Sequence, residues 1–223
     1  MVRALAKAGF AGVNVTIPHK EAALAICDRV ELSALRAGAV NTLVFRDGIE
    51  GSNTDGYGFI KNLRAHGVNP GAGPALILGA GGAARAIAAA LQDAGAVVTI
   101  CNRTPERATV LAAHLPGAET LGWAHREAAL GDFALLVNTT SLGMVHHEPL
   151  EMDLSRAEAT LAVADIVYAP LETALLAQAK ARNLKAVEGL GMLLHQAVPS
   201  FEAWFGVRPE VTPDLRAIIE ATL

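Results

Sequence analysis

Short apolar runs alternate with helical spacings of apolar residues over most of this 223-residue chain. A fully apolar run covers residues 75–78, a helical pattern covers 83–94, and a second apolar run covers 97–101. Three later runs, at 133–137, 161–167 and 185–187, predict further strands. Continuous apolar strands separated by helices are typical of a parallel sheet that is covered on both faces. The fold class predicted is therefore α/β.

The first third of the chain predicts shorter elements. Strand-like residues at 12–16 are followed by Pro18, and the turn Arg46-Asp-Gly48 leads from one predicted strand into another. Apolar residues at helical spacing predict a helix over 57–65. The remaining predicted elements are an amphipathic helix at 1–9, a helix at 21–26, a strand at 39–45, helices opened by Thr104-Pro105 and Thr212-Pro213, and a helix after Gly189-Leu-Gly191.

The segment His66-Gly-Val-Asn-Pro-Gly-Ala-Gly-Pro74 is the clearest break in the chain. Glycine and proline are the strongest interruptions of regular structure, and here they gather between two differently patterned parts. We therefore interpret the helix before this segment as the connector between two domains.

Composition narrows the class of protein. Hydrophobic residues make up 52% of the chain and charged residues 18%, which describes a compact globular protein. The net charge is −4 without a basic cluster, so small molecules are expected as partners rather than nucleic acid. No apolar run has the length of a membrane span.

The cysteines and the paired histidines predict no metal site. Cys27 and Cys101 fit no metal or disulfide spacing and indicate thiols in a reducing cytoplasm. The adjacent His146-His147 favour a solvated loop over a metal site.

The motif Gly79-Ala-Gly-Gly-Ala-Ala84 fits the glycine pattern of dinucleotide-binding loops. Alone this pattern is weak, but here it follows a predicted strand and opens a predicted helix, which is the context such a loop needs. A pyrophosphate would then lie on the free N–H groups at the start of that helix. The motif predicts a dinucleotide cofactor.

The end of the next predicted strand indicates which dinucleotide. An NAD-selective site would have a carboxylate there for the ribose hydroxyl, whereas this chain has Asn102-Arg-Thr104, with Arg107 one helical turn further. A guanidinium pairs with a 2′-phosphate. NADP is therefore favoured over NAD, with solvated arginines at a helix start as the alternative interpretation.

Lys20 and Asp55 are the candidate proton-transfer residues. Each follows a predicted strand and is surrounded by small polar side chains, among them Asn14, Thr16 and Asn41. A surface lysine and a helix-capping aspartate are the alternative interpretations. A lysine beside a carboxylate could protonate or deprotonate an alcohol oxygen during hydride transfer, and which of the two carries the proton stays open, so we treat them as a dyad.

Seven segments of this chain resemble those of shikimate dehydrogenases, in the same order, from about Ala11 to Gly206. They are Asn14-Val-Thr-Ile-Pro-His-Lys20, Gly38-Ala-Val-Asn-Thr42, Asn53-Thr-Asp-Gly56, Gly79-Ala-Gly-Gly-Ala83, Asn102-Arg-Thr104, Asn138-Thr-Thr-Ser141 and Gly189-Leu-Gly-Met-Leu-Leu-His-Gln196. The resemblance implies a cytoplasmic, NADP-dependent oxidoreductase of chorismate and aromatic amino-acid biosynthesis, a monomer or homodimer, that interconverts 3-dehydroshikimate and shikimate. It implies a substrate domain at 1–56 and 190–223 and a Rossmann-type NADP domain at 57–189, with a cleft between them.

The resemblance also implies roles for individual residues. Lys20 and Asp55 match the catalytic pair, and no metal is implied. Substrate contacts are implied for Thr16, Asn41, Asp55, Tyr168 and Gln196. Cofactor contacts are implied for Gly79, Ala80, Gly81, Gly82, Ala83, Asn102, Arg103, Thr104, Arg107, Thr139 and Gly189, the last near the nicotinamide.

The chain departs from the family in one respect. Members of the family normally begin with a strand and a loop whose two serines hold the substrate carboxylate, and neither Ser33 nor Ser52 lies in such a context. If the chain is complete, its substrate domain is expected to lack a strand and this anchor. Two alternatives to a shikimate dehydrogenase therefore stay open: a truncated NADP-binding remnant without turnover, and a quinate/shikimate dehydrogenase that prefers NAD.

Overall fold

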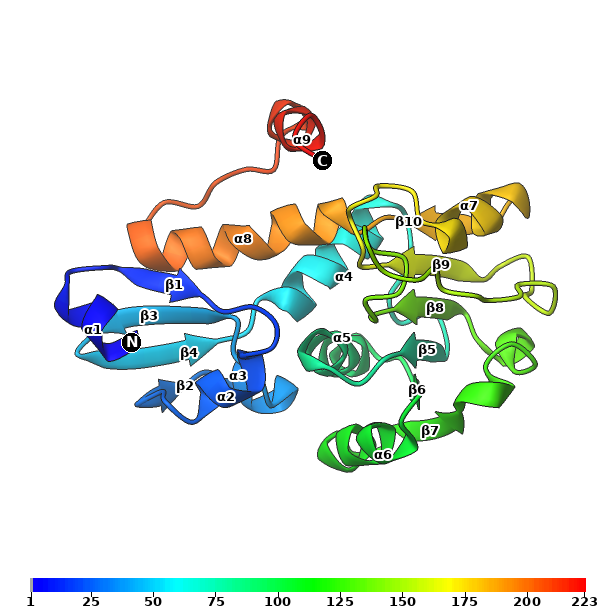
Figure 1. The fold of residues 1–223 in the computed structure, drawn as a ribbon, viewed down its shortest axis with the longest axis horizontal. Coiled ribbons are helices and arrows are strands. Elements are labelled where there is room, and N and C mark those ends of the chain that lie inside the picture. The colour runs from blue at the N-terminus through cyan, green and yellow to red at the C-terminus, as the bar shows by residue number, and fades with distance from the viewer. Residues whose placement is uncertain (1) are drawn as a thin grey trace.

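The computed structural model describes residues 2–223, which form two sheets joined by helices (Figure 1). The smaller sheet has the order β1-β3-β4-β2, in which β3 pairs antiparallel with β1 and β4, and β2 pairs parallel with β4. Its strands are β1 (Gly12–Asn14), β2 (Arg29–Val30), β3 (Thr42–Arg46) and β4 (Gly48–Ser52). The hairpin between β3 and β4 turns at Asp47, at the turn that the sequence predicts.

The larger sheet is parallel throughout, with the order β10-β9-β8-β5-β6-β7. Its strands are β5 (Ala75–Leu78), β6 (Val98–Asn102), β7 (Glu119–Gly122), β8 (Leu135–Asn138), β9 (Ala162–Asp165) and β10 (Lys185–Val187). Every residue of β5, β8 and β9 is buried, as expected for strands covered on both faces. The predicted α/β class with a Rossmann-like parallel sheet is confirmed.

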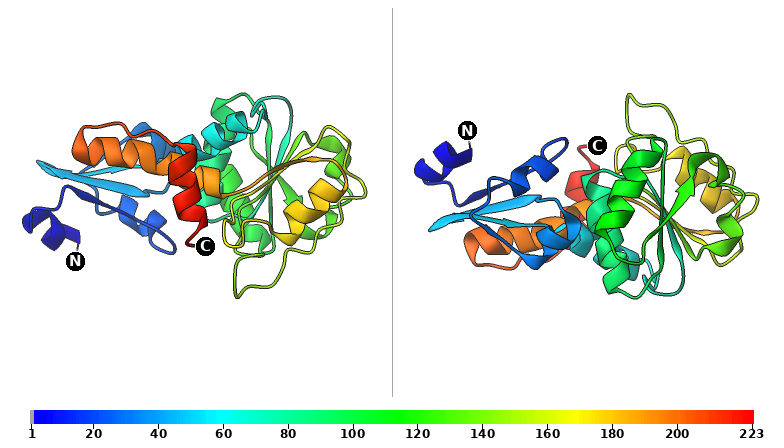
Figure 2. Two further views of the ribbon diagram at one scale, coloured as in Figure 1. Left: turned by 90° about the horizontal axis from the view of Figure 1, so that it is seen from above. Right: turned by 90° about the horizontal axis from the view of Figure 1, so that it is seen from below.

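Helices cover both faces of the larger sheet (Figure 2). Because side chains alternate along a strand, Ile77 of β5 packs in one core with residues of α5 and α6, while Leu76 and Leu78 pack in the other with residues of α7. The helices are α1 (Val2–Lys7), α2 (Lys20–Leu24), α3 (Leu32–Ala37), α4 (Asp55–Ala65), α5 (Gly82–Asp93), α6 (Pro105–His114), α7 (Ala174–Ala181), α8 (Leu190–Phe205) and α9 (Pro213–Glu220), with short 3₁₀ turns at Trp123–His125 and Leu130–Asp132.

The helices α4 and α8 lie against each other and run between the two sheets (Figure 1). They approach closely because Gly191 of α8 has no side chain: a Cβ there would overlap the side chain of Asn62 on α4. Asn62 donates instead to the carbonyl of Glu188, 2.6 Å away. The position of α4 fits the connector inferred from the sequence, while the domain boundaries at 56/57 and 189/190 stay predictions.

Four elements were not predicted from the sequence: β2, α3, β7 and α7. The strand β2 has two residues, too few for a period to be seen. In α3 the buried face is Ala34 and Ala37, whereas the larger Leu32 and Leu35 are exposed, so the hydrophobic pattern indicates the wrong face. The strand β7 is an edge strand with mostly exposed side chains. None of these elements changes the two-sheet arrangement.

Candidate active site

Lys20 and Asp55 are in direct contact, although 35 residues separate them. Lys20 begins α2 and Asp55 begins α4, and Lys20 Nζ lies 2.6 Å from Asp55 Oδ2. Their side chains are only 14% and 5% exposed. Two charges held this far from water are tolerated because they neutralise each other. The geometry of the predicted dyad is therefore present.

Asp55 is fixed by further hydrogen bonds. Its second carboxylate oxygen, Oδ1, accepts from Asn41 Nδ2 at 2.9 Å, and its backbone N–H donates to Asn53 Oδ1 at 3.0 Å. Asn41 Oδ1 in turn accepts from the backbone N–H of Thr54 at 2.9 Å. These residues meet because the start of β3 lies opposite the end of β4, where Thr42 pairs with Ser52. The carboxylate thus has one orientation, with one oxygen toward Lys20.

A third segment, from α8, completes this polar cluster. Gln196 Oε1 lies 3.2 Å from Asn41 Nδ2 and 3.3 Å from Thr54 Oγ1. One turn further along α8, Ser200 Oγ lies 2.6 Å from Thr42 Oγ1. Of the predicted substrate contacts, Asn41, Asp55 and Gln196 therefore come together. Thr16 lies exposed after β1 and Tyr168 half-buried after β9, and their roles stay predictions.

The glycine loop lies at the carboxyl end of β5, in the middle of the parallel sheet. Three positions of the loop are glycine for different reasons. Gly79 has a φ of +112°, and a Cβ there would lie 2.5 Å from Thr139 Oγ1. A Cβ on Gly82 would lie 3.2 Å from Lys20 Cβ, whereas a Cβ on Gly81 would meet no atom within 4 Å. Protein packing explains Gly79 and Gly82 but not Gly81.

The start of α5 has the features of an anion site. Gly81 is its N-cap residue, and no side chain caps it. The first N–H groups of an uncapped helix are free to donate to a phosphate. Ala84, in the first turn of α5, is fully buried, which fits the small third residue of the motif. These observations fit a pyrophosphate above Gly81.

The stem of Lys20 lies beside this loop. A Cβ on Gly82 would lie only 3.2 Å from Lys20 Cβ, so the dyad lies next to the first turn of α5. Lys20 begins α2, in the part of the chain with the smaller sheet, and Gly82 begins α5, in the part with the larger sheet, so the predicted proton-transfer pair meets the predicted cofactor loop at this contact.

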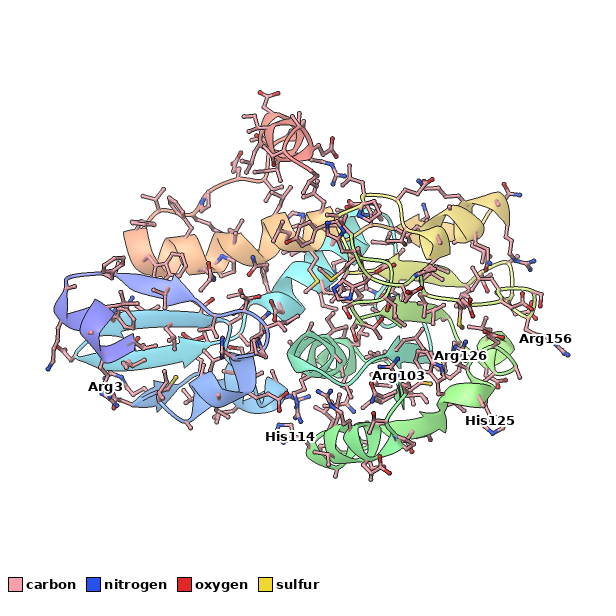
Figure 3. The ribbon with its side chains drawn as sticks, in the orientation of Figure 1. Arg3, Arg103, His114, His125, Arg126 and Arg156 are labelled. Atoms are coloured by element: carbon pink, nitrogen blue, oxygen red, sulfur yellow. The ribbon has the colours of Figure 1, made fainter. Side chains whose placement is uncertain are left out.

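The predicted 2′-phosphate residues follow β6 at the same edge of the sheet. Arg103, Thr104 and Arg107 are exposed, and Asn102 Nδ2 donates to the carbonyl of Thr104 at 2.8 Å, which shapes the turn. In Figure 3, Arg103 lies in projection beside α5, over the region of β5 and β6. Thr104 is the N-cap residue of α6, as predicted, but its side chain makes no capping hydrogen bond.

A hollow of about 240 Å³ lies between the two parts of the molecule, next to Arg107. Glu21 of α2 lines one side of it, and the glycine loop, α5 and α6 line the other. Arg85 of α5 crosses the hollow to Glu21 at 3.6 Å, and no partner for Arg85 Nε lies among residues 2–223. Arg85 was not predicted as a functional residue, because an arginine on a helix has no distinguishing signal in the sequence. The full lining is Glu21, Ala80, Arg85, Glu106, Arg107 and Val110.

The cysteines, histidines and carboxylates outside this site are the candidates for a separate metal or nucleophile centre. Burial raises the pKa of the Cys101 thiol to about 11, which keeps it protonated. Within residues 2–223, no group of three or more histidine, cysteine, aspartate or glutamate side chains is arranged to hold a metal ion. Over the same residues, no helix combines the length and the apolar character that crossing a membrane requires.

Three family models match the chain. "Shikimate dehydrogenase substrate binding domain" matches residues 1–43, "Shikimate / quinate 5-dehydrogenase" matches 72–168, and "Shikimate 5'-dehydrogenase C-terminal domain" matches 189–219. Among the most similar curated relatives, the NADP(+) shikimate dehydrogenase of Acidiphilium cryptum is 71% identical over 223 residues, which are 100% of this chain and 80% of the relative. That of Gluconobacter oxydans is 53% identical, with 100% and 80% covered.

Solved structures show the same architecture. Shikimate 5-dehydrogenase of Thermus thermophilus in complex with NADP(H) and shikimate superposes with a TM-score of 0.88 at 39% identity, covering 99% of this chain and 82% of the other. Quinate dehydrogenase of Corynebacterium glutamicum in complex with NAD superposes with a TM-score of 0.91 at 31% identity, covering 100% and 81%.

Proposed function

Because this chain belongs to the shikimate dehydrogenase family, we propose that it catalyses the reversible, NADP-dependent reduction of 3-dehydroshikimate to shikimate, a step toward chorismate and the aromatic amino acids. The observation that carries this proposal is the Lys20–Asp55 pair, 2.6 Å from nitrogen to oxygen, lying against Gly82 at the start of α5. It joins a proton-transfer pair to a dinucleotide loop in one site.

The cofactor that this function needs fits the residues present. The open space at Gly81 and the uncapped start of α5 suit a pyrophosphate, and the exposed Arg103 and Arg107 suit a 2′-phosphate. NADPH, when bound, supplies the hydride that reduces the substrate's carbonyl carbon. Thr139 and Gly189, on loops at the same edge of the sheet, are the proposed contacts near its other end.

The Lys20–Asp55 dyad transfers the proton in this reaction. As the carbonyl oxygen gains negative charge, the Lys20–Asp55 pair delivers a proton to it, and in the reverse direction the pair removes the proton from the alcohol. Asn41 has two N–H hydrogens for three acceptors, on Thr54, Asp55 and Gln196. The two contacts of Gln196 Oε1, at 3.2 Å to Asn41 Nδ2 and 3.3 Å to Thr54 Oγ1, are longer than the other two Asn41 contacts, at 2.9 Å, so this oxygen is the one most readily given to a substrate hydroxyl, which supports Gln196 as a substrate contact.

The buried position of the dyad increases its effect. Charges and dipoles that are already oriented in a water-poor site stabilise developing charge without reorganisation. Asp55 has this preorganisation, because Asn41 and Lys20 hold both of its oxygens. Thr16 and Tyr168 complete the proposed substrate site from the two loops that follow β1 and β9.

Turnover is tested by adding shikimate and NADP to the purified chain and following NADPH absorbance. The wild type should show a shikimate-dependent rate, and Lys20→Met and Asp55→Asn should each lower kcat at least 100-fold, since general acid–base catalysis contributes roughly 10²–10⁴-fold. Lys180→Met is the matched control, because Lys180 is paired with Glu172 on the exposed face of the molecule. NADPH binding without any shikimate-dependent rate would favour the remnant without turnover.

Substrate and cofactor breadth need the same assay with other reactants. Quinate in place of shikimate, and NAD in place of NADP, should each give a lower kcat/KM. A higher kcat/KM with quinate and NAD would identify a quinate/shikimate dehydrogenase instead. The proposal includes a cytoplasmic location, which the free thiols Cys27 and Cys101 support, and the monomer or homodimer state stays a prediction for sedimentation to test.

A further inference from the structure

Asp165 is a buried carboxylate with no assigned role. It is the last residue of β9, it is 2% exposed, and within residues 2–223 it has no ion-pair partner. Three donors converge on it instead. Asn138 Nδ2 and the backbone N–H of Val167 each donate to Oδ1 at 3.0 Å, and Thr173 Oγ1 donates to Oδ2 at 2.8 Å. Burial raises the pKa of this carboxyl, so keeping it here carries a cost.

The first donor connects Asp165 to the loop after β8. Asn138 is the last residue of β8 and lies opposite Asp165 in the sheet. Its Oδ1 accepts from the backbone N–H and the hydroxyl of Thr140, at 3.0 and 2.7 Å, and its Nδ2 also donates to the carbonyl of Leu142 at 3.1 Å. The loop that carries Thr139 is therefore folded around a side chain that Asp165 holds.

The second donor fixes the loop after β9. The bond from Val167 N–H turns the chain directly after the strand, one residue before Tyr168. Gly189 packs on the same turn, since a Cβ there would overlap the carbonyl of Ile166. A single oxygen, Asp165 Oδ1, thus holds the two loops that bear the proposed contacts at the nicotinamide end.

We propose that Asp165 is a positioning residue: by holding the loops after β8 and β9 together through Oδ1, it sets the nicotinamide end of the cofactor relative to the substrate. This inference rests on the proposed function, from which the roles of Thr139, Tyr168 and Gly189 come. Its other oxygen, Oδ2, serves a separate purpose, because Thr173 is the N-cap residue of α7 and accepts from Leu176 N–H.

The two oxygens can be separated by mutation. Asp165→Asn keeps an oxygen at the Oδ1 position and should retain kcat within about threefold, whereas Asp165→Ala removes both bonds to the loops and should lower kcat on the order of 100-fold, as small misplacements in active sites do. Thr173→Val, the matched control, touches only Oδ2 and should lower the melting temperature with little change in kcat. Asn138→Ser removes the hydrogen bond from Asn138 to Asp165 Oδ1 without changing Asp165. It provides the test if Asp165→Ala fails to fold.

Binding measurements separate positioning from a general loss of structure. Adenosine 2′,5′-bisphosphate occupies only the adenosine end of the cofactor site, so its Kd should stay within twofold in Asp165→Ala and Asn138→Ser, while the Kd for NADPH rises tenfold or more. Equal losses for both ligands, a wild-type kcat in these variants, or the same kcat loss in Asp165→Asn or Thr173→Val would overturn the proposal. The two binding constants need no turnover, so a wild type that lacks shikimate-dependent activity contradicts the proposed function alone.

Discussion

Substitution of Gly81 by alanine separates the needs of the cofactor from those of the fold. The residue has φ −90° and ψ −172°, which any amino acid can adopt, and a Cβ there meets no protein atom within 4 Å. The free energy of unfolding should therefore fall by no more than about 1 kcal/mol, which is the difference between glycine and alanine as N-cap residues, because no steric overlap adds to it.

Cofactor binding should respond strongly to the same change. If a pyrophosphate lies on the first N–H groups of α5, the new methyl group occupies the side from which it approaches. A loss of one charge-assisted hydrogen bond, about 1.5–3 kcal/mol, raises the Kd for NADPH roughly 10- to 150-fold. Calorimetry measures this Kd, and thermal or denaturant unfolding measures stability on the same preparation.

Gly79→Ala provides the contrast within the same loop. Its positive φ and the short approach to Thr139 make any side chain strained, so it should lower the free energy of unfolding by about 1–3 kcal/mol. The reasoning is refuted if Gly81→Ala binds NADPH as tightly as the wild type, or if Gly81→Ala loses as much stability as Gly79→Ala.

Three further predictions concern specificity, packing and pH. Arg103→Gln should reduce the ratio of kcat/KM for NADP to that for NAD by roughly 10- to 100-fold through the lost guanidinium–phosphate bonds, and an unchanged ratio in steady-state assays would exclude Arg103 from this role. Gly191→Ala should destabilise the protein by about 1–3 kcal/mol in denaturant unfolding, because its Cβ overlaps Asn62 where α4 and α8 cross, and a wild-type midpoint would contradict that contact. Burial, Lys61 and His66 lower the pKa of His195, so the folded state favours its neutral form and stability is lost as the pH falls below about 6.5. His195→Gln should flatten the unfolding free energy between pH 7 and 5, and an equally steep profile would contradict the assignment.

The sequence predicted best what depends on continuous patterns. The apolar run of β5 was predicted to the residue, and the glycine loop and the strand–helix rhythm gave the parallel sheet. Polar residues that the sequence places near strand ends also proved to be neighbours: Lys20 and Asn41 each donate a hydrogen bond to Asp55, which is distant from both in the sequence. Motif order was sufficient there because each motif stands where a strand ends.

The sequence could not predict features that depend on packing between elements. A side chain at Gly82 would crowd Lys20, whereas a side chain at Gly81 would meet no protein atom. The sequence does not distinguish these two positions, because both are glycines of one motif. Arg85 and Asp165 were missed for the same reason. A helical arginine and an aspartate after an apolar strand are common, and only burial and convergent donors distinguish them.

The helix α8 sets the distance between a proposed cofactor contact and a proposed substrate contact. Gly189, at its N-cap, packs on the loop after β9, and Gln196, seven residues on, reaches Asn41 beside the dyad. At 1.5 Å per residue these points are about 10 Å apart along a rigid rod. Tilting the two sheets relative to each other does not alter that interval, so under the proposed function the cofactor contact and the substrate contact on α8 keep a constant spacing. Insertion of one residue between them would turn Gln196 about 100° around the axis, away from Asn41.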